Sequence, residues 1–508
     1  MKRNTAGMRT RRTKTRSQEA MRTARTKRSY GRKKTTDGPE RDSNHLILGS
    51  AVFFCALFVA MAAYLCIYIP THSQELFNNS YNSRQSVLAQ KNTRGSILSA
   101  DGKILAQTEV DEEGNEQRVY PYANEFAHIV GYSTKGRMGL ENLANYYLSN
   151  TSASVSEQAQ NAAAGKKNPG DNLITTLDSE LQKAAYDAMG IYQGAVIAME
   201  PSTGRILAMV SKPDFDPNEI ADIWEEVTED TESSVLLNRA TQGLYPPGST
   251  FKIATALEYI RENPDTWENY SYQCTGSYTY GDSTIRCFHG SQHGQVDFAR
   301  SFAKSCNASF ANMGMSLDRS SFLSTLEDLL INQPLPVDLT YSESRVQLTA
   351  DSEDADMIQT VIGQGKTQIT PLHLCLITSA IANDGVLMAP YEIERIESPD
   401  GTVIRQYEPQ EYGRLISEEE AQILKELMTD VVEEGTATRL SGQTYTAAGK
   451  TGSAEFNESK EDSHAWFTGF APAEDPQIVV TVIIENIGSG GDYAVPTAKR
   501  VFDAYFAS

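Results

Sequence analysis

The sequence has few cysteines, little positive charge beyond its N-terminus and only one long apolar run. Six cysteines among 508 residues are too few for a small scaffold held together by disulfides. Residues 1–43 carry 15 basic and 4 acidic side chains, so their net charge is +11 and that of the remaining chain is −32. A body this acidic repels nucleic-acid phosphates, which excludes nucleic acid as a partner. We find no internal repeat, and a hydrophobic content of 40% excludes a wholly disordered chain.

The single long apolar run predicts a membrane anchor. Residues 46–69 are uncharged and mostly apolar, and 24 helical residues can cross a hydrocarbon core of about 30 Å. We therefore expect a transmembrane helix over residues 44–70. The basic tail, residues 1–43, has many like charges and few apolar side chains, which predicts disorder. The positive-inside rule then places the tail in the cytoplasm and the rest of this single-pass cell-membrane protein outside.

The exported part divides by composition into a small and a large domain. Residues 152–170 are rich in Ala, Ser and Gln and are expected to form a linker. A small pedestal domain, residues 71–168, precedes a larger domain, residues 169–508. In the larger domain, helix and strand patterns mix without strict alternation, which predicts an α+β fold with an antiparallel sheet flanked by helices. The clearest elements are a strand followed by a helix capped at Asp178, a hairpin over residues 194–211, a strand over 478–486 and a closing helix over 497–507.

Ser249 and Lys252 are the first candidates for chemistry. Pro-Pro-Gly precedes the serine and an apolar helical pattern follows it, so the serine should stand at a helix start. Serine and lysine are then three residues apart on one helix face. A serine hydroxyl becomes a good nucleophile when a neighbouring base accepts its proton, and a lysine can be that base when burial or nearby positive charge lowers its pKa. The pair therefore predicts covalent catalysis and a second cation nearby.

Two further motifs follow in order along the chain. The first runs from Ser305 to Asn307, and the second runs from Lys450 to Gly452 on a predicted strand. Lys450 could supply the second cation and also attract a substrate carboxylate. The order S-x-x-K, S-x-N, K-T-G is typical of penicillin-binding proteins and class A β-lactamases.

Longer segments extend this resemblance to the class B penicillin-binding proteins over residues 94–508. The segment RGSILSADGKILA resembles the family's sequence after the membrane anchor, and the family's order continues with GAVIAMEPSTGRILAMVSKPDFDPN, NRATQGLYPPGSTFK, HGQVDFARSFAKSCNASF, GQGKTQITPLHL and GKTGSAEF. The resemblance implies a monofunctional peptidoglycan D,D-transpeptidase of the compact-pedestal type, with a domain like those of penicillin-binding proteins and serine β-lactamases. No segment resembles a glycosyltransferase module, so the resemblance assigns glycan polymerisation to a membrane-embedded partner.

The resemblance also implies a role for each motif residue. Ser249 would attack the penultimate D-alanine carbonyl of a stem peptide with Lys252 as its base, and β-lactams would acylate the same serine. Ser305 would pass a proton to the leaving amine, while Asn307 would hold Lys252. The backbone N–H groups of Ser249 and Ser453 would form the oxyanion hole. The terminal carboxylate would be bound by the strand that carries Lys450, Thr451, Gly452 and Ser453, the last standing where the family more often has Thr.

Two other functions share these motifs. A β-lactamase-like hydrolase would release its acyl group to water, and a non-catalytic β-lactam receptor would keep it. The anchor and pedestal favour the transpeptidase over the hydrolase, and a tail too short for an output domain disfavours the receptor. Asp328 and Asn332 have a D-x-x-x-N spacing, but the apolar periodicity around them indicates an ordinary helix end. The sequence leaves open a role in septation, elongation or sporulation, and the identity of the acceptor amine.

The cysteines of the larger domain leave a choice open. Cys274 and Cys287 flank a predicted hairpin in an exported region, so they can form a disulfide or stay as thiols. With His289 and His293 they could also supply four zinc ligands, but the histidine segment is not a helix that would hold them on one face. We therefore expect no metal and no cofactor, and we treat Cys306 as a buried small side chain.

Overall fold

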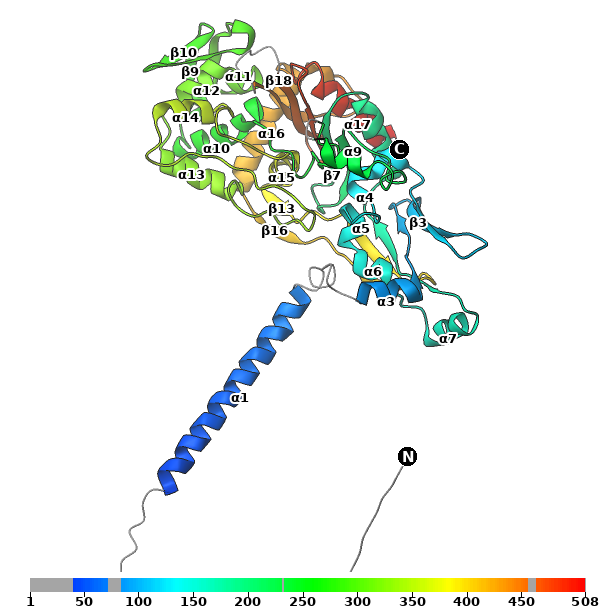
Figure 1. Cartoon of the computed structure of the whole chain (residues 1–508). Helices are drawn as coiled ribbons and strands as arrows, with labels where there is room; N and C mark the ends of the chain where they lie inside the picture. Colours follow the sequence, from blue (N-terminus) through cyan, green and yellow to red (C-terminus); the bar gives the residue numbers. More distant parts are fainter. Residues whose placement is uncertain (1–39, 72–83, 231–232, 456–462, 508) are drawn as a thin grey trace, which may run out of the picture. The chain divides into compact units, whose positions relative to one another are not determined.

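The computed structural model describes residues 40–71, 84–230, 233–455 and 463–507, and the chain divides into two compact units at residue 71 (Figure 1). Helix α1 (Glu40–Thr71) is the described part of the first unit. Its segment His45–Ile69 is long and apolar enough to cross a membrane, as expected. The helix begins at Glu40, so its first four residues belong to the predicted disordered tail, which ends at residue 43. Residues 1–39 of that tail lie outside the described residues.

The second unit is built around a five-stranded antiparallel sheet, which confirms the predicted α+β fold. Phe467 and Thr468 are neighbours on one central strand, so their side chains point to opposite faces. Phe467 packs against Phe502 of the C-terminal helix, and Thr468 shares a hydrogen bond with Thr378 of another helix. Helices therefore cover both faces. The strand order is β17 (Ala448–Glu455), β18 (Ser463–Ala471), β19 (Ile478–Ile484), β7 (Gly194–Met199) and β8 (Ile206–Lys212), with α8 (Ser179–Met189) and α17 (Ala494–Ala507) on one face and α15 (Pro371–Ala382) and α16 (Glu418–Glu433) on the other.

Local capping signals set several of these helices. Asp178 accepts a hydrogen bond from the Leu181 N–H at the start of α8, as the sequence predicts. Thr370 caps α15 in the same way, and Pro371 occupies its first turn, where a missing N–H costs nothing. The motif GQGKT is thus a loop before a helix.

A helical lobe stands beside the sheet and carries the nucleophile motif (Figure 1). It consists of α10 (Lys252–Glu262), α11 (Phe298–Ala303), α12 (Asn307–Gly314), α13 (Arg319–Asp328) and α14 (Asp354–Thr360). Two small antiparallel pairs cover one end of it, namely β9 (Ser271–Cys274) with β12 (Gly294–Asp297), and β10 (Ser277–Tyr280) with β11 (Ser283–Arg286).

The pedestal is centred on a second, six-stranded sheet whose strands come from distant parts of the chain. Its order is β15 (Val403–Gln406), β14 (Ile393–Glu397), β6 (Asn172–Thr175), β2 (Ile97–Leu98), β3 (Ile104–Val110) and β4 (Glu116–Val119). Two of these strands follow the pedestal in sequence by more than 200 residues. It is completed by the short helices α3 (Arg84–Lys91), α4 (Ala127–Val130), α5 (Gly139–Leu143) and α6 (Asn145–Ser149). A separate pair, β13 (Val386–Met388) with β16 (Glu411–Arg414), flanks β14 and β15 in the sequence.

The predicted linker is more ordered than its composition suggested. Residues 155–163 form helix α7, and the Ser154 hydroxyl accepts a hydrogen bond from the Glu157 N–H at its start. Ala, Gln and Glu are strong helix formers, and a serine cap stabilises the first turn. Asn168 and Pro169 then pair with Asn92 and Thr93. The domain boundary at residue 168 stays a prediction.

A buried ion triad holds the start of the pedestal. Glu141 is fully buried and receives hydrogen bonds from Arg94 and Arg118, at 2.6 and 2.7 Å. Burial raises the pKa of the Glu141 carboxyl, but the two arginines together lower it by more than burial raises it. The net shift is therefore downward. Arg94 belongs to the RGS segment after the anchor, whereas no sequence motif points to its partner Glu141.

Candidate active site

Ser249 stands at the start of a helix, next to the amine of Lys252. A 3-10 turn, Gly248–Phe251, leads directly into α10. In such a turn side chains three residues apart stack over each other, and Lys252 Nζ lies 3.0 Å from Ser249 Oγ. The serine is half-buried, while the lysine is fully buried. A reactant can therefore reach the hydroxyl while the amine stays shielded from bulk water.

Lys252 is held by the motif that begins at Ser305. Its Nζ donates to the Ser305 carbonyl at 2.7 Å and to Asn307 Oδ1 at 2.6 Å. Ser305 Oγ lies at 3.2 Å from the same nitrogen. Burial lowers the pKa of Lys252 to about 8, because a charged amine loses its hydration there. A lysine with that pKa is partly neutral near pH 7.5 and can accept the serine's proton.

Ser305 also connects Lys252 to Lys450. Lys450 Nζ donates to Ser305 Oγ at 3.0 Å and is fully buried. Burial and the positive charge of Lys252 lower the pKa of Lys450 well below its ordinary value. Ser305 has a left-handed backbone with φ of 54°, which a non-glycine residue adopts only when its surroundings hold it. The hydroxyl of Ser305 is thus fixed between two amines.

The strand β17 brings the third motif against the nucleophile's loop. It is an edge strand of the sheet, and a Cβ added to Gly248 or Gly452 would lie within 3.0 Å of Ser453 O or Pro247 O respectively. Only glycines allow this approach, and Gly248 also has a φ of 54°. Ser453 Oγ accepts a hydrogen bond from the Gly490 N–H. The structure thus gathers all the predicted motif residues: Ser249, Lys252, Ser305, Asn307, Lys450, Thr451, Gly452 and Ser453.

Other contacts at this site were not evident from the sequence. The rings of Phe310 and Phe302 lie 5.4 and 5.5 Å from Lys252 Nζ and Lys450 Nζ, which are cation–π distances. Gly363, in the GQGKT segment, accepts the Gly248 N–H at 2.9 Å. The GQGKT segment therefore supports the loop of the nucleophile.

The neighbouring strand β18 places two aromatic side chains, Trp466 and His464, behind the site. Trp466 and His464 pair with Gly452 and Ala454. The Trp466 indole donates to the Pro246 carbonyl at 3.0 Å, which ties the sheet to the segment before Ser249. His464 packs edge-on against Tyr245. Both side chains are buried and support the site from behind.

The D-x-x-x-N pair has structural partners, as expected. Asp328 is the last residue of α13 and pairs with Arg261 at 2.8 Å. Asn332 exchanges hydrogen bonds with the backbone of Val346. These contacts account for both side chains without a role at Ser249.

Of the alternatives that the sequence left open for Cys274 and Cys287, the structure has the free thiols and not the disulfide. Cys274 and Cys287 are free thiols whose Sγ atoms lie 3.7 Å apart. His289 is exposed and lies edge-to-face with its neighbour Phe288, outside the cysteine group, so the ligand set that would contain it does not form. Cys306 takes its place beside Cys274, Cys287 and His293.

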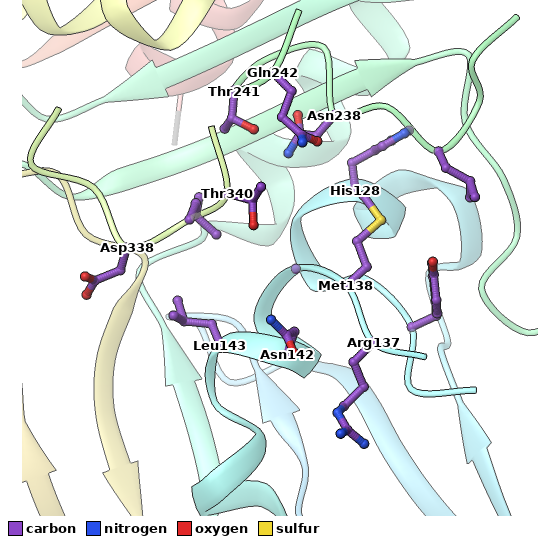
Figure 2. A pocket seen from close by; sticks show the side chains of 14 residues that line it. His128, Arg137, Met138, Asn142, Leu143, Asn238, Thr241, Gln242, Asp338 and Thr340 are labelled. Carbon is purple, nitrogen blue, oxygen red and sulfur yellow. The ribbon is translucent and has the colours of Figure 1, made fainter. Parts of the chain in front are cut away.

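A separate pocket of about 250 Å³ lies where the pedestal meets the larger domain (Figure 2). His128, Arg137 and Asn142 line it from the pedestal, and Thr241 and Asp338 from the other side. None of the catalytic motif residues lines this pocket.

The comparisons with known proteins agree with this geometry. Residues 194–503 match the penicillin binding protein transpeptidase domain, and residues 94–173 match the penicillin binding protein A dimerisation domain. The chain belongs to the penicillin-binding protein transpeptidase family. The predicted family and fold are thereby confirmed.

Individual relatives of this penicillin-binding protein cover most of the chain. Peptidoglycan D,D-transpeptidase PbpA of Mycolicibacterium smegmatis is 32% identical over 81% of this chain and 88% of its own length. Peptidoglycan D,D-transpeptidase MrdA of Acinetobacter baumannii is 29% identical over 76% of this chain and 65% of its own. The ceftriaxone acyl-enzyme structure of penicillin-binding protein A from Mycobacterium tuberculosis superposes with a TM-score of 0.75 at 29% identity, covering 82% of this chain and 99% of that one.

Proposed function

We propose that this chain is a peptidoglycan D,D-transpeptidase that cross-links stem peptides through an acyl-enzyme on Ser249. One observation carries the proposal: Lys252 Nζ lies 3.0 Å from the Ser249 hydroxyl and has a pKa of about 8. A base near neutrality within hydrogen-bond reach is what a serine nucleophile requires. β-Lactams, which acylate the related enzyme from Mycobacterium tuberculosis, acylate the same oxygen.

The acylation step moves one proton from serine to the leaving group. Ser249 Oγ bonds to the carbonyl carbon of the penultimate D-alanine while its proton passes to Lys252. The carbonyl oxygen becomes an oxyanion, which the backbone N–H groups of Ser249 and Ser453 stabilise. When the peptide bond breaks, the proton passes through Ser305 Oγ, 3.2 Å from Lys252 Nζ, to the nitrogen of the departing D-alanine. An acceptor amine then attacks the ester carbonyl, the ester C–O bond breaks as the new amide bond forms, and a proton that the acceptor amine loses passes to Ser249 Oγ.

The third motif binds the donor's terminal carboxylate. Lys450 supplies the positive charge, and the hydroxyls of Thr451 and Ser453 supply hydrogen bonds. The exposed edge of β17 offers backbone groups to an extended peptide. The buried position of Lys450, 3.0 Å from Ser305 Oγ, connects carboxylate binding to the proton path.

Turnover distinguishes transfer from hydrolysis. The full chain, purified in detergent, is given a pentapeptide donor and an amine acceptor, and the products are followed by mass spectrometry. We expect D-alanine release and a cross-linked product, both lost in Ser249→Ala, and one covalent penicillin per chain. Sustained hydrolysis of a chromogenic cephalosporin would favour the β-lactamase-like alternative, and acylation without any cross-linked product would favour the receptor.

The chain's topology and partner complete the proposal. We place the segment His45–Ile69 of α1 in the cell membrane, residues 1–43 in the cytoplasm and the domains at 71–168 and 169–508 outside, because 15 of the chain's 45 basic residues precede the anchor. A membrane-embedded glycan polymerase then supplies the strands that are cross-linked. Protease added to intact cells should digest the body and spare the tail; the opposite pattern would overturn the orientation.

A further inference from the structure

Three cysteines and one histidine form a compact group at the edge of the active-site lobe. Cys274 ends β9, Cys287 follows β11, His293 precedes β12, and Cys306 caps the N-terminus of α12. Their ligand atoms all lie within 4.8 Å of one another. The three cysteines are buried, with exposures of 1%, 2% and 0%, and the histidine is half-buried. Three segments therefore bring their reactive atoms to one point, namely the end of β9, the connection between β11 and β12, and the start of α12.

Three distances within the group match those between ligands of one tetrahedral metal ion, and all the ligand atoms lie within 4.8 Å of one another. Zinc–sulfur bonds of about 2.3 Å at the tetrahedral angle place two sulfurs about 3.8 Å apart, and a histidine nitrogen about 3.6 Å from a sulfur. The Cys274–Cys287 and Cys287–Cys306 sulfur separations are 3.7 and 3.8 Å. His293 Nδ1 lies 3.5 Å from Cys274 Sγ. A disulfide would instead need about 2.05 Å between two sulfurs.

We propose that Cys274, Cys287, His293 and Cys306 bind one zinc ion. Three thiolates and an imidazole are a donor set that suits zinc, and four protein ligands make a closed structural site. Binding releases the three thiol protons to solvent and changes no oxidation state. The Ser309 N–H donates to Cys306 Sγ, an outer contact of the kind that orients a metal-bound thiolate.

The position of Cys306 gives this site a consequence for the proposed active site. It stands between Ser305 and Asn307, the residues that hold Lys252. Asn307 also donates to the Arg286 carbonyl, beside Cys287. A zinc ion would therefore anchor the loop that keeps Ser305 in its left-handed conformation. The metal itself would be structural and take no part in the transfer.

The metal content of the purified full chain tests the proposal. We expect one zinc per chain by mass spectrometry of the elements after purification in detergent without chelator. Cys287→Ala should reduce this content at least tenfold, whereas Cys375→Ala, a change at a buried cysteine of α15 outside the group, should leave it unchanged. X-ray absorption of the wild-type chain should show three sulfur ligands at about 2.3 Å and one nitrogen at about 2.0–2.1 Å.

The half-buried ligand provides a second, milder variant in case Cys287→Ala does not fold. His293→Ala should lose zinc or bind it with one ligand fewer by X-ray absorption, independently of transpeptidase activity. Zinc well below one per chain in the wild type, or equal zinc in wild type, Cys287→Ala and His293→Ala, would overturn the proposal. A native chain two hydrogens lighter in intact mass, with a Cys274–Cys287 disulfide, would overturn it too. None of these results depends on whether the chain is a transpeptidase.

Discussion

Lys252 and Lys450 both place their amine nitrogens within hydrogen-bond distance of one oxygen, Ser305 Oγ, at 3.2 and 3.0 Å. Both lysines are fully buried. Two ammonium groups this close repel each other in a medium that screens poorly, so the pair tends to hold fewer than two protons. The arrangement therefore favours a state in which one of the two amines is neutral before substrate arrives.

Acylation by penicillin should depend on pH through Lys252. Its pKa is lowered to about 8 by burial, and only the neutral amine accepts a proton. The rate should therefore rise about tenfold per pH unit below 8 and level off above it. Stopped-flow measurement of acylation between pH 6 and 9.5 checks this. A rate that rises as expected for the ordinary lysine pKa, about 10.4, would show that burial does not lower the pKa of Lys252.

Lys450→Ala should slow acylation by penicillins that carry a carboxylate. The change removes a charged hydrogen bond worth about 1.5–3 kcal/mol, which corresponds to roughly 10- to 150-fold in rate. Lys366→Ala, at an exposed lysine, is the control. Equal acylation rates at pH 7.5 for both variants would exclude Lys450 from the site.

Ser249→Ala should abolish covalent labelling by a fluorescent penicillin. The hydroxyl is the group held against Lys252 Nζ, and alanine has no atom to acylate. Gel fluorescence of the full chain measures the effect, with Ser441→Ala at an exposed position as the control. Labelling of the Ser249 variant at the control's rate would identify a different nucleophile.

Glu141→Ala should destabilise the pedestal by about 3–5 kcal/mol, because it leaves the buried charges of Arg94 and Arg118 without their partner. Glu113→Ala, on an exposed turn, should change stability by less than about 0.5 kcal/mol. Urea unfolding in detergent, followed by tryptophan fluorescence, compares the two. The arginines hold the pKa of Glu141 below its ordinary value, so its stabilisation is present above about pH 4.5 and is lost as the pH falls further. Equal midpoints for both variants would contradict this role.

Local patterns account for what the sequence predicted well. The spacing of Ser249 and Lys252 brings them together within one helical turn, and the cap at Asp178 and the hairpin after Gly194 are likewise local. The other residues of the site were predicted from the order of the motifs, which resembles that of a known family.

Contacts between distant segments were beyond local reasoning. No sequence pattern near Cys274 indicates that Cys306 lies beside it. Their contact depends on how α12 packs against the strands β9, β10 and β11. Glu141 reads as an ordinary helix residue until Arg94 and Arg118 enclose it. Residues 152–170 were predicted to be a linker because of their Ala, Ser and Gln content. Several of these residues are also strong helix formers, and residues 155–163 form the capped helix α7.

The pairing of β14 with β6 joins residues 393–397 to residues 172–175 in the middle of the pedestal sheet. A protease cut within residues 152–167 would not release the N-terminal fragment, because β2 of that fragment pairs with β6, which stays with β14 and β15 in the other fragment. The two pieces should migrate together in native gel filtration and separate only in denaturant. Force applied to β2 would likewise pass through its hydrogen bonds with β6 to β14, and so reach residues 393–397 without crossing the covalent chain between them.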